Sequence, residues 1–330
     1  MRYSNIKTSI VEQFKAPQGN KVVPFILGAP GGGKSACARD IVDSLGFETV
    51  VEFTASLRDP VDVLGTPNNN GEYTRWVPPE EFYNLRQGRA ALILEELSDA
   101  PIPMQNALCG VIYDRRAGNL QLSKDLFIIA TGNRTEDKSG ANRITSKLAN
   151  RTRRFDFQEN IDDWTEWALD NDMDPVLIQF LRFRPGLLSD FDANRFANPT
   201  PRAWERVNLI PASLDSGLFF DNVSGEVGEG AAAEYTGFRR IYMSLPDVDS
   251  ILLDPAGADV PQDPATLYAL TGALARKSTK DNFDRVSKYL SRMSPEFNVM
   301  ATKDAIKLQP TIKHSRAFVE WASKNAEVLM

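Results

Sequence analysis

Short apolar runs alternate with helical patterns through the first half of the chain. Residues 34–45 repeat apolar side chains at the spacing of a helix face. The runs with the composition of buried strands are Val22–Leu27, Glu48–Phe53, Ala90–Leu94, Leu126–Ala130 and Arg154–Phe157. Because strands and helices alternate, the pattern predicts an α/β fold with a five-stranded parallel sheet.

Polar segments interrupt this alternation at two places. Residues Asp59–Pro79 are rich in proline, asparagine and glycine, and Asn68-Asn69-Asn70-Gly71 within them predicts a hairpin turn. A helix is expected from Pro103 through Tyr113, and a second short hairpin begins at Ala117-Gly118-Asn119. Both hairpins therefore extend beyond the predicted sheet.

The second half of the chain is helical in pattern. Trp164 and Trp167 lie three residues apart, which favours packing in a helical core. Prolines and aspartates between residues 245 and 264 favour an exposed connection. We therefore expect an α/β domain over 1–160, a helical domain over 161–245 and a helical C-terminal extension over 246–330.

Composition is that of a soluble globular protein. The chain has 330 residues, of which 42% are apolar and 25% are charged. No apolar run approaches the ~20 residues that a membrane span needs, and the N-terminus lacks the apolar core of a signal peptide. We expect a cytoplasmic protein that does not interact with a membrane.

Charge and rare residue types exclude several classes of function. The formal net charge of −6 favours protein partners over broad nucleic-acid binding. With His314 as the single histidine and only two cysteines, neither a histidine-rich metal site nor a Ser-His-Asp triad is possible. His314 is expected to be a solvated or capping residue. Cys37 and Cys109 are expected to be small buried hydrophobes rather than a disulfide.

A glycine-rich loop carries the strongest chemical signal. It has the pattern G-x-x-x-x-G-K-[ST] and lies between the first predicted strand and the first helix. The candidate phosphate-binding residues are Gly28, Ala29, Pro30, Gly31, Gly32, Gly33, Lys34, Ser35 and Ala36. Glycines let backbone N–H groups turn toward phosphates, Lys34 would reach the β- and γ-phosphates, and Ser35 would bind Mg²⁺. The loop therefore predicts ATP and Mg²⁺ as cofactors, whereas the alternative is a purely structural turn.

Polar groups follow two other predicted strands. Leu92-Ile93-Leu94 ends in Glu95 and Glu96, which would place one carboxylate on Mg²⁺ and one on the attacking water. Asn133 follows the fourth strand, where its amide would orient that water. Taken alone, these residues would be solvated acids and a turn residue, but they occur downstream of a phosphate loop.

The order of these motifs resembles that of AAA+ ATPases, and within them the MoxR-related, dynein-like subfamily. The resemblance covers about residues 20 to 210. Lys34 and Ser35 match the Walker A pair, Glu95-Glu96 the Walker B acids and Asn133 the sensor 1 position. Further matching segments are Leu148–Arg151 (arginine finger), Thr200–Ala203 (sensor 2), Asp59–Gly65 and Thr74–Pro79.

The resemblance implies an assembly and two further catalytic residues. In a homo-hexamer, Arg151 would act on the nucleotide of a neighbouring subunit, and Arg202 of the helical lid would sense the same phosphate. Arg153 and Arg154 remain alternatives for the finger. Glu95 departs from the aspartate usual in the family, and its extra methylene shifts the metal-binding carboxylate by about one bond length.

The resulting hypothesis is a MoxR-like ATPase that remodels or activates a protein client. The resemblance also implies a partner with a von Willebrand factor A domain. It would place the two hairpins at a ring pore or a partner, and the alternative is that both are ordinary surface turns. The main alternative is a nucleic-acid motor or restriction-type translocase subunit, which the acidic net charge disfavours. A nucleotide-binding switch with degenerate catalysis is a third possibility, and it depends on Glu95.

Overall fold

The computed structural model describes residues 1–69, 71–137, 142 and 144–325. The chain forms two compact units. One contains Met1–Asn160 and Phe191–Arg195, and the other contains Ile161–Asp190 and Phe196–Met330. Among the described residues, every helix is too short or too polar to cross a membrane.

The first unit is built on a five-stranded parallel sheet. Its strands are β1 (Val23–Gly28), β2 (Thr49–Thr54), β5 (Ala90–Glu95), β8 (Phe127–Asn133) and β9 (Thr152–Asp156). Their order is β2-β5-β8-β1-β9, so β8 lies between β1 and β5. All five predicted strands are confirmed, with ends shifted by a few residues. The predicted fold class, a P-loop α/β domain followed by a helical region, is also confirmed. The carboxyl ends of β1, β5 and β8 meet at one edge of this sheet.

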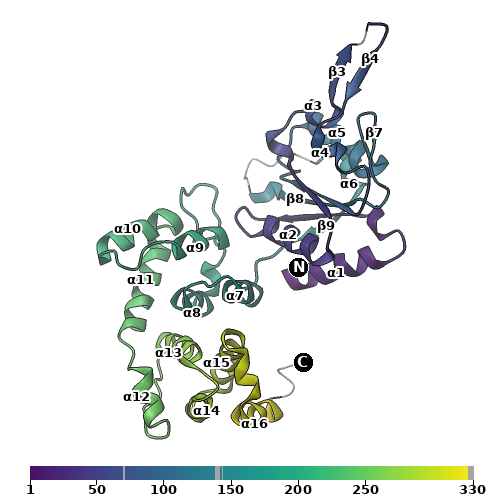
Figure 1. Ribbon diagram of the computed structural model, residues 1–330. Helices are drawn as coiled ribbons and strands as arrows, with labels where there is room; N and C mark the ends of the chain where they lie inside the picture. The colour runs from purple at the N-terminus through teal and green to yellow at the C-terminus, as the bar shows by residue number, and fades with distance from the viewer. Residues whose placement is uncertain (70, 138–141, 143, 326–330) are drawn as a thin grey trace. The chain divides into compact units, whose positions relative to one another are not determined.

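Side chains alternate between the two faces of the sheet. Ile26 of β1 packs on one face beneath α1 (Tyr3–Lys15) and α2 (Lys34–Leu45), which Figure 1 shows on the same side. Phe25 and Leu27 pack on the other face. Both faces are covered, which explains why β1, β5 and most of β8 are buried along their length. Helix α1 was not predicted from the sequence.

Short helices and two hairpins cover or extend from the second face. The helices are α3 (Val61–Leu64), α4 (Glu80–Tyr83), α5 (Ile102–Cys109) with a π-helical turn over Gly110–Asp114, and α6 (Ser146–Ala149). The hairpins are β3 (Thr66–Asn69) with β4 (Thr74–Val77), and β6 (Arg116–Ala117) with β7 (Leu120–Gln121). Both predicted hairpins are therefore confirmed, although Asn70 of the first turn lies outside the described residues. Figure 1 shows β3 and β4 projecting away from the sheet.

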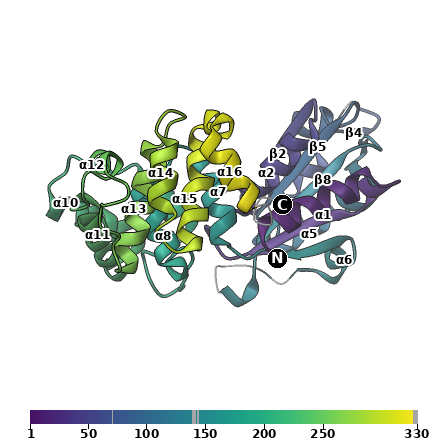
Figure 2. The ribbon, with the colours of Figure 1, turned by 90° about the horizontal axis from the view of Figure 1, so that it is seen from below.

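The second unit is helical in the part that the structure describes. Its helices are α7 (Ile161–Asp170), α8 (Pro175–Phe183), α9 (Pro201–Asn208), α10 (Ser216–Val227), α11 (Glu229–Met243), α12 (Val248–Leu253), α13 (Pro264–Lys277), α14 (Phe283–Leu290), α15 (Pro295–Leu308) and α16 (Arg316–Lys324). Helices α8, α13 and α15 lie side by side (Figure 2). A buried ion pair joins α8 to α15, because Arg182 Nη2 donates to Asp304 Oδ1 at 2.8 Å. Short 3₁₀ turns complete the chain at Gly19–Lys21, Ala55–Leu57, Thr135–Asp137, Pro185–Leu187 and Pro310–His314.

The structure corrects one expectation in this helical unit and decides between two alternatives for another residue. The exposed connection expected over 245–264 is wrong in part, because α12 forms there and buries Val248, Ile251 and Leu252 in an apolar cluster. The sequence around α12 is rich in polar residues and its apolar residues are few, so the segment shows no clear helical pattern. His314 is exposed as expected, but it caps no helix, because Ser315 accepts from Phe318 N at the start of α16.

Other expectations about packing hold. Trp164 is buried in the core of the helical unit, and Trp167 packs against that core. Cys37 is buried, Cys109 is half-buried, and both are free thiols. Two apolar clusters occur in the helical unit, and Tyr242, among other residues, packs against both. The expected division at residues 245 and 246 stays a prediction.

Candidate nucleotide-binding site

The phosphate loop connects the end of β1 to the start of α2. Gly31 and Gly33 have φ angles of 71° and 101°, in the left-handed region that glycine adopts without steric cost. Gly33 is the N-cap residue of α2, a helix of 12 residues. The first turn of α2, which includes Ser35 and Ala36, therefore leaves backbone N–H groups and a favourable dipole at the loop. This backbone fits a phosphate group.

Lys34 is the charged group at the centre of this loop. Its side chain is buried, and its Nζ donates to Gly28 O at 3.0 Å and to Ala29 O at 2.6 Å. Nζ also donates to Asn133 Oδ1 at 2.9 Å, which connects the ends of β1 and β8. The structure thus brings together two residues that the sequence predicted separately. A bound phosphate would replace one of these acceptors.

Glycines also allow close packing behind the loop. A methyl group added to Gly28 would lie 3.2 Å from Phe157 Cβ, and one added to Gly32 would lie 2.0 Å from Glu159 Oε1. The Glu159 carboxylate therefore lies against the phosphate loop, and its Oε1 is buried with no hydrogen-bond partner in the described structure. Burial raises the pKa of Glu159, which the nearby charges of Arg134 and Lys34 partly oppose. Sequence reasoning missed Glu159, and the only local signal was Gly32, the middle of three consecutive glycines.

Glu95 ends β5 and is held by an arginine from α2. Arg39 Nη2 lies 3.1 Å from Glu95 Oε1, while its Nε and Nη2 both donate to Glu52 at 2.7 Å. The bidentate contact with Glu52 raises the pKa of Arg39 and lowers that of Glu52. Arg39 therefore fixes the longer Glu95 side chain, a contact that sequence reasoning did not predict.

Glu96 occupies a strained turn directly after β5. Its φ is 53°, a left-handed conformation that costs a non-glycine residue roughly 1–3 kcal/mol. Its Oε2 accepts a hydrogen bond from the hydroxyl of Ser56, which follows β2. The Glu96 side chain is exposed, so its carboxylate is accessible to water. Strain of this kind is typical of catalytic turns.

Asn133 is held by two residues of the turn after Glu96. Its backbone N–H donates to Ser98 Oγ at 2.7 Å, and its Nδ2 donates to Asp99 Oδ2 at 3.0 Å. Asp99 Oδ1 is buried without a hydrogen-bond partner among the described residues. Burial, together with the charge of Glu96, raises the pKa of Asp99. Ser98 and Asp99 carry no motif signal, so sequence reasoning missed both.

The donor set near the loop is compatible with Mg²⁺ bound together with phosphates. In the part of the chain that the structure describes, the Ser35 hydroxyl has no hydrogen bond within the protein, and Arg39 contacts only Oε1 of Glu95. Groups of three or more histidine, cysteine or carboxylate ligands are absent from the described residues. Mg²⁺ does not need such a group, because it usually takes one or two carboxylates plus phosphate oxygens and water. Ser35 and Glu95 are the residues that would hold it.

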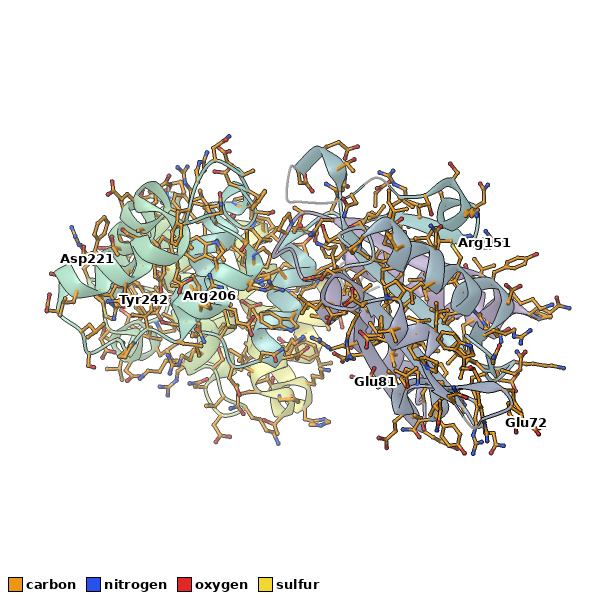
Figure 3. All side chains as sticks on the ribbon, turned by 90° about the horizontal axis from the view of Figure 1, so that it is seen from above. Glu72, Glu81, Arg151, Arg206, Asp221 and Tyr242 are labelled. Atoms are coloured by element: carbon orange, nitrogen blue, oxygen red, sulfur yellow. The ribbon has the colours of Figure 1, made fainter. Side chains whose placement is uncertain are left out.

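The three clustered arginines have different surroundings. Arg154 pairs with Asp156 at 2.7 Å, and Arg153 Nη1 donates to Gln13 Oε1 at 2.6 Å. Arg151 lies at the edge of its unit in Figure 3, with its guanidinium 4.7 Å from the ring of Tyr113 and its Nη1 on Lys147 O. Within the described chain, neither Arg151 nor Arg153 has a carboxylate partner, whereas Arg154 does.

Arg202 belongs to the helical unit. It is the second residue of α9, a helix capped by the Thr200 hydroxyl, which accepts from Ala203 N at 3.2 Å. This position at a helix start agrees with the local prediction. Its action on a nucleotide phosphate stays a prediction.

Comparisons with known proteins add no family assignment. No protein-family profile matches the chain, and no curated protein sequence matches it. Similar solved structures include NtrX from Brucella abortus, with 17% identity and a TM-score of 0.42 over 92% of this chain and 67% of that chain. NtrX in complex with ATP has 14% identity and a TM-score of 0.41 over 99% of this chain and 68% of that chain. A mutant of Thermotoga maritima RuvB has 14% identity and a TM-score of 0.42 over 88% of each chain. No conclusion about the function of this chain rests on likeness at this level.

Proposed function

We propose that this protein is a ring-forming AAA+ ATPase of the MoxR type, which hydrolyses Mg-ATP to remodel or activate a protein client. The observation that carries the proposal is the convergence of the phosphate loop, the acids at the end of β5 and Asn133 at the end of β8 at one sheet edge. The contact of 2.9 Å between Lys34 and Asn133 Oδ1 is its centre. A homo-hexamer and a partner with a von Willebrand factor A domain belong to the proposal.

Each residue has a role that its surroundings support. The loop and Lys34 bind the phosphates, while Ser35 and Glu95 hold Mg²⁺, which neutralises phosphate charge. Glu96 accepts a proton from the attacking water, because its carboxylate is exposed on a turn directly beyond β5. In the ring, Arg151 reaches the nucleotide of the adjacent subunit and stabilises charge in the transition state.

Paired variants test this proposal. Glu96→Gln should bind ATP as the wild type does but lose turnover by ~10²-fold or more, the scale of general-base catalysis. Lys34→Ala should lose binding itself. Glu72→Gln, an exposed glutamate at the tip of the β3–β4 hairpin, is the matched control and should change neither property.

Two results would overturn the ATPase proposal. One is a wild-type protein that stays monomeric and fails to hydrolyse ATP at high concentration with Mg²⁺. The other is unimpaired turnover by Glu96→Gln, which would remove that residue from the role of base. Light scattering and phosphate release provide both measurements.

A nucleic-acid motor is the second candidate, and one surface feature favours it. The β3–β4 hairpin exposes Tyr73 and Trp76 beside Arg75, a combination that can stack on bases and contact phosphates. Stimulation of ATP hydrolysis by DNA, lost at higher salt, would favour this candidate over the protein remodeller.

A further inference from the structure

The amide of Asn133 is fixed in direction by two neighbours of opposite charge. The ammonium of Lys34 lies 2.9 Å from Oδ1, and the carboxylate oxygen Oδ2 of Asp99 lies 3.0 Å from Nδ2. Rotating the amide by half a turn would place its NH₂ group against the ammonium and its oxygen against the carboxylate. Both contacts would then be repulsive, so the hydrogen-bond network determines which atom faces Lys34.

Asp99 is itself fixed by the turn that contains the proposed base. Its backbone N–H donates to Glu96 O at 2.9 Å, and Asn142 Nδ2 donates to Asp99 O at 3.0 Å. The Ser98 hydroxyl lies 3.4 Å from Asp99 Oδ2. These contacts connect the Asp99 backbone to the Glu96 turn and to Asn142, and none of them involves Lys34.

The ends of β5 and β8 are also joined through their backbones. Leu97 N donates to Thr131 O at 2.9 Å, and Asn133 N donates to Ser98 Oγ at 2.7 Å. The approach is close enough that a methyl group on Gly132 would lie 2.6 Å from Ser98 Oγ. The side-chain contact between Asp99 and Asn133 thus lies within a tightly packed junction.

We infer that Asp99 is a positioning residue for hydrolysis, which keeps the oxygen of the Asn133 amide, rather than its NH₂ group, directed at the phosphate end of the site. This inference rests on the proposed ATPase function. With Nδ2 engaged by Asp99, Asn133 presents a hydrogen-bond acceptor. Its Oδ1 can accept from Lys34 or from a hydrogen of the attacking water, while Asp99 engages one of the two hydrogens on Nδ2.

The experiment separates positioning from binding and folding. Asp99→Ala removes the acceptor for Nδ2 and should lower kcat by ~10–100-fold, the scale of losing one hydrogen bond to a charged group. The Kd of a fluorescent ATP analogue should stay within about threefold, because the phosphate loop is unchanged. Asp99→Asn keeps an acceptor oxygen at the same place and should restore kcat to within about fivefold of wild type. The exposed Asp125→Ala is the matched control.

A double-mutant cycle adds a readout that a merely structural role would not move. In an Asn133→Ala background, Asp99→Ala should cause no further loss of kcat, because the residue that it positions is already absent. Wild-type kcat in Asp99→Ala, a full additional loss in the double variant, or no restoration by Asp99→Asn would each overturn the inference. A wild-type protein without ATPase activity would instead overturn the proposed function, and the positioning role with it.

Discussion

Neutralising Glu159 should strengthen nucleotide binding. The Glu159 carboxylate lies against Gly32, inside the loop that receives the phosphates, and its Oε1 has no hydrogen-bond partner among the described residues. A bound phosphate brings negative charge close to this carboxylate. Glu159→Gln keeps the shape of the side chain and removes the repulsion.

The size of the effect follows from Coulomb's law. Two unit charges about 5 Å apart interact by ~3 kcal/mol at an effective dielectric constant of ~20. Partial exposure of Glu159 and the opposing charges of Arg134 and Lys34 reduce this value. A net gain of ~1 kcal/mol is the reasonable expectation, and it corresponds to roughly fivefold tighter binding.

The effect should depend on pH with a definite sign. Burial raises the pKa of Glu159, so at low pH the wild-type side chain is neutral and resembles glutamine. As pH rises through this raised pKa, the carboxylate becomes charged and wild-type affinity falls relative to the variant. The raised pKa also means that charging Glu159 costs more in the folded than in the unfolded protein, so the wild type loses stability as pH rises through it. At pH 8, Glu159→Gln should therefore unfold at a higher temperature than the wild type.

Calorimetric titration with ADP from pH 5.5 to 8 measures this prediction. The wild-type dissociation constant is divided by that of Glu159→Gln at each pH, and this ratio cancels the titration of the nucleotide itself. Glu72→Gln serves as the control, because that residue lies at the exposed tip of the β3–β4 hairpin (Figure 3). A ratio that stays near one, or that falls as pH rises, would refute the electrostatic reasoning.

Two further predictions concern other contacts. Arg151→Ala should lower ATP turnover by ~10³-fold in assembled protein while ATP binding is kept, as expected for an arginine finger. Arg154→Ala should have little effect on turnover, because Arg154 is paired with Asp156 at the surface, and equal losses from both variants would contradict the assignment. Asp304→Ala should lower the free energy of unfolding by ~3–5 kcal/mol, because it leaves the largely buried Arg182 without its partner. Chemical denaturation measures this loss, and Asp249→Ala, at an exposed ion pair, is the control.

The elements of the first unit were largely predictable from the sequence. Strands that are buried on both faces appear as continuous apolar runs, and the loop from Gly28 to Ser35 is contiguous, so its chemistry can be recognised without a fold. Helix α12 was not predicted, because its few apolar residues form a core only through contacts with the two helices that follow it, α13 and α14. Secondary structure can be predicted from the local sequence where a whole segment is buried, because the segment then appears as one continuous apolar run.

What the sequence determined was therefore the set of reactive groups: the phosphate loop, Lys34, the two acids at the end of one strand and an asparagine at the end of another. Tertiary structure decided their partners. Lys34 and Asn133 are 99 residues apart in the sequence, and they are in contact because the parallel crossovers place β8 between β1 and β5. The same order brings Asp99 to Asn133 and sets Glu159 against Gly32. Such contacts depend on which strand ends become neighbours, and no local pattern records that.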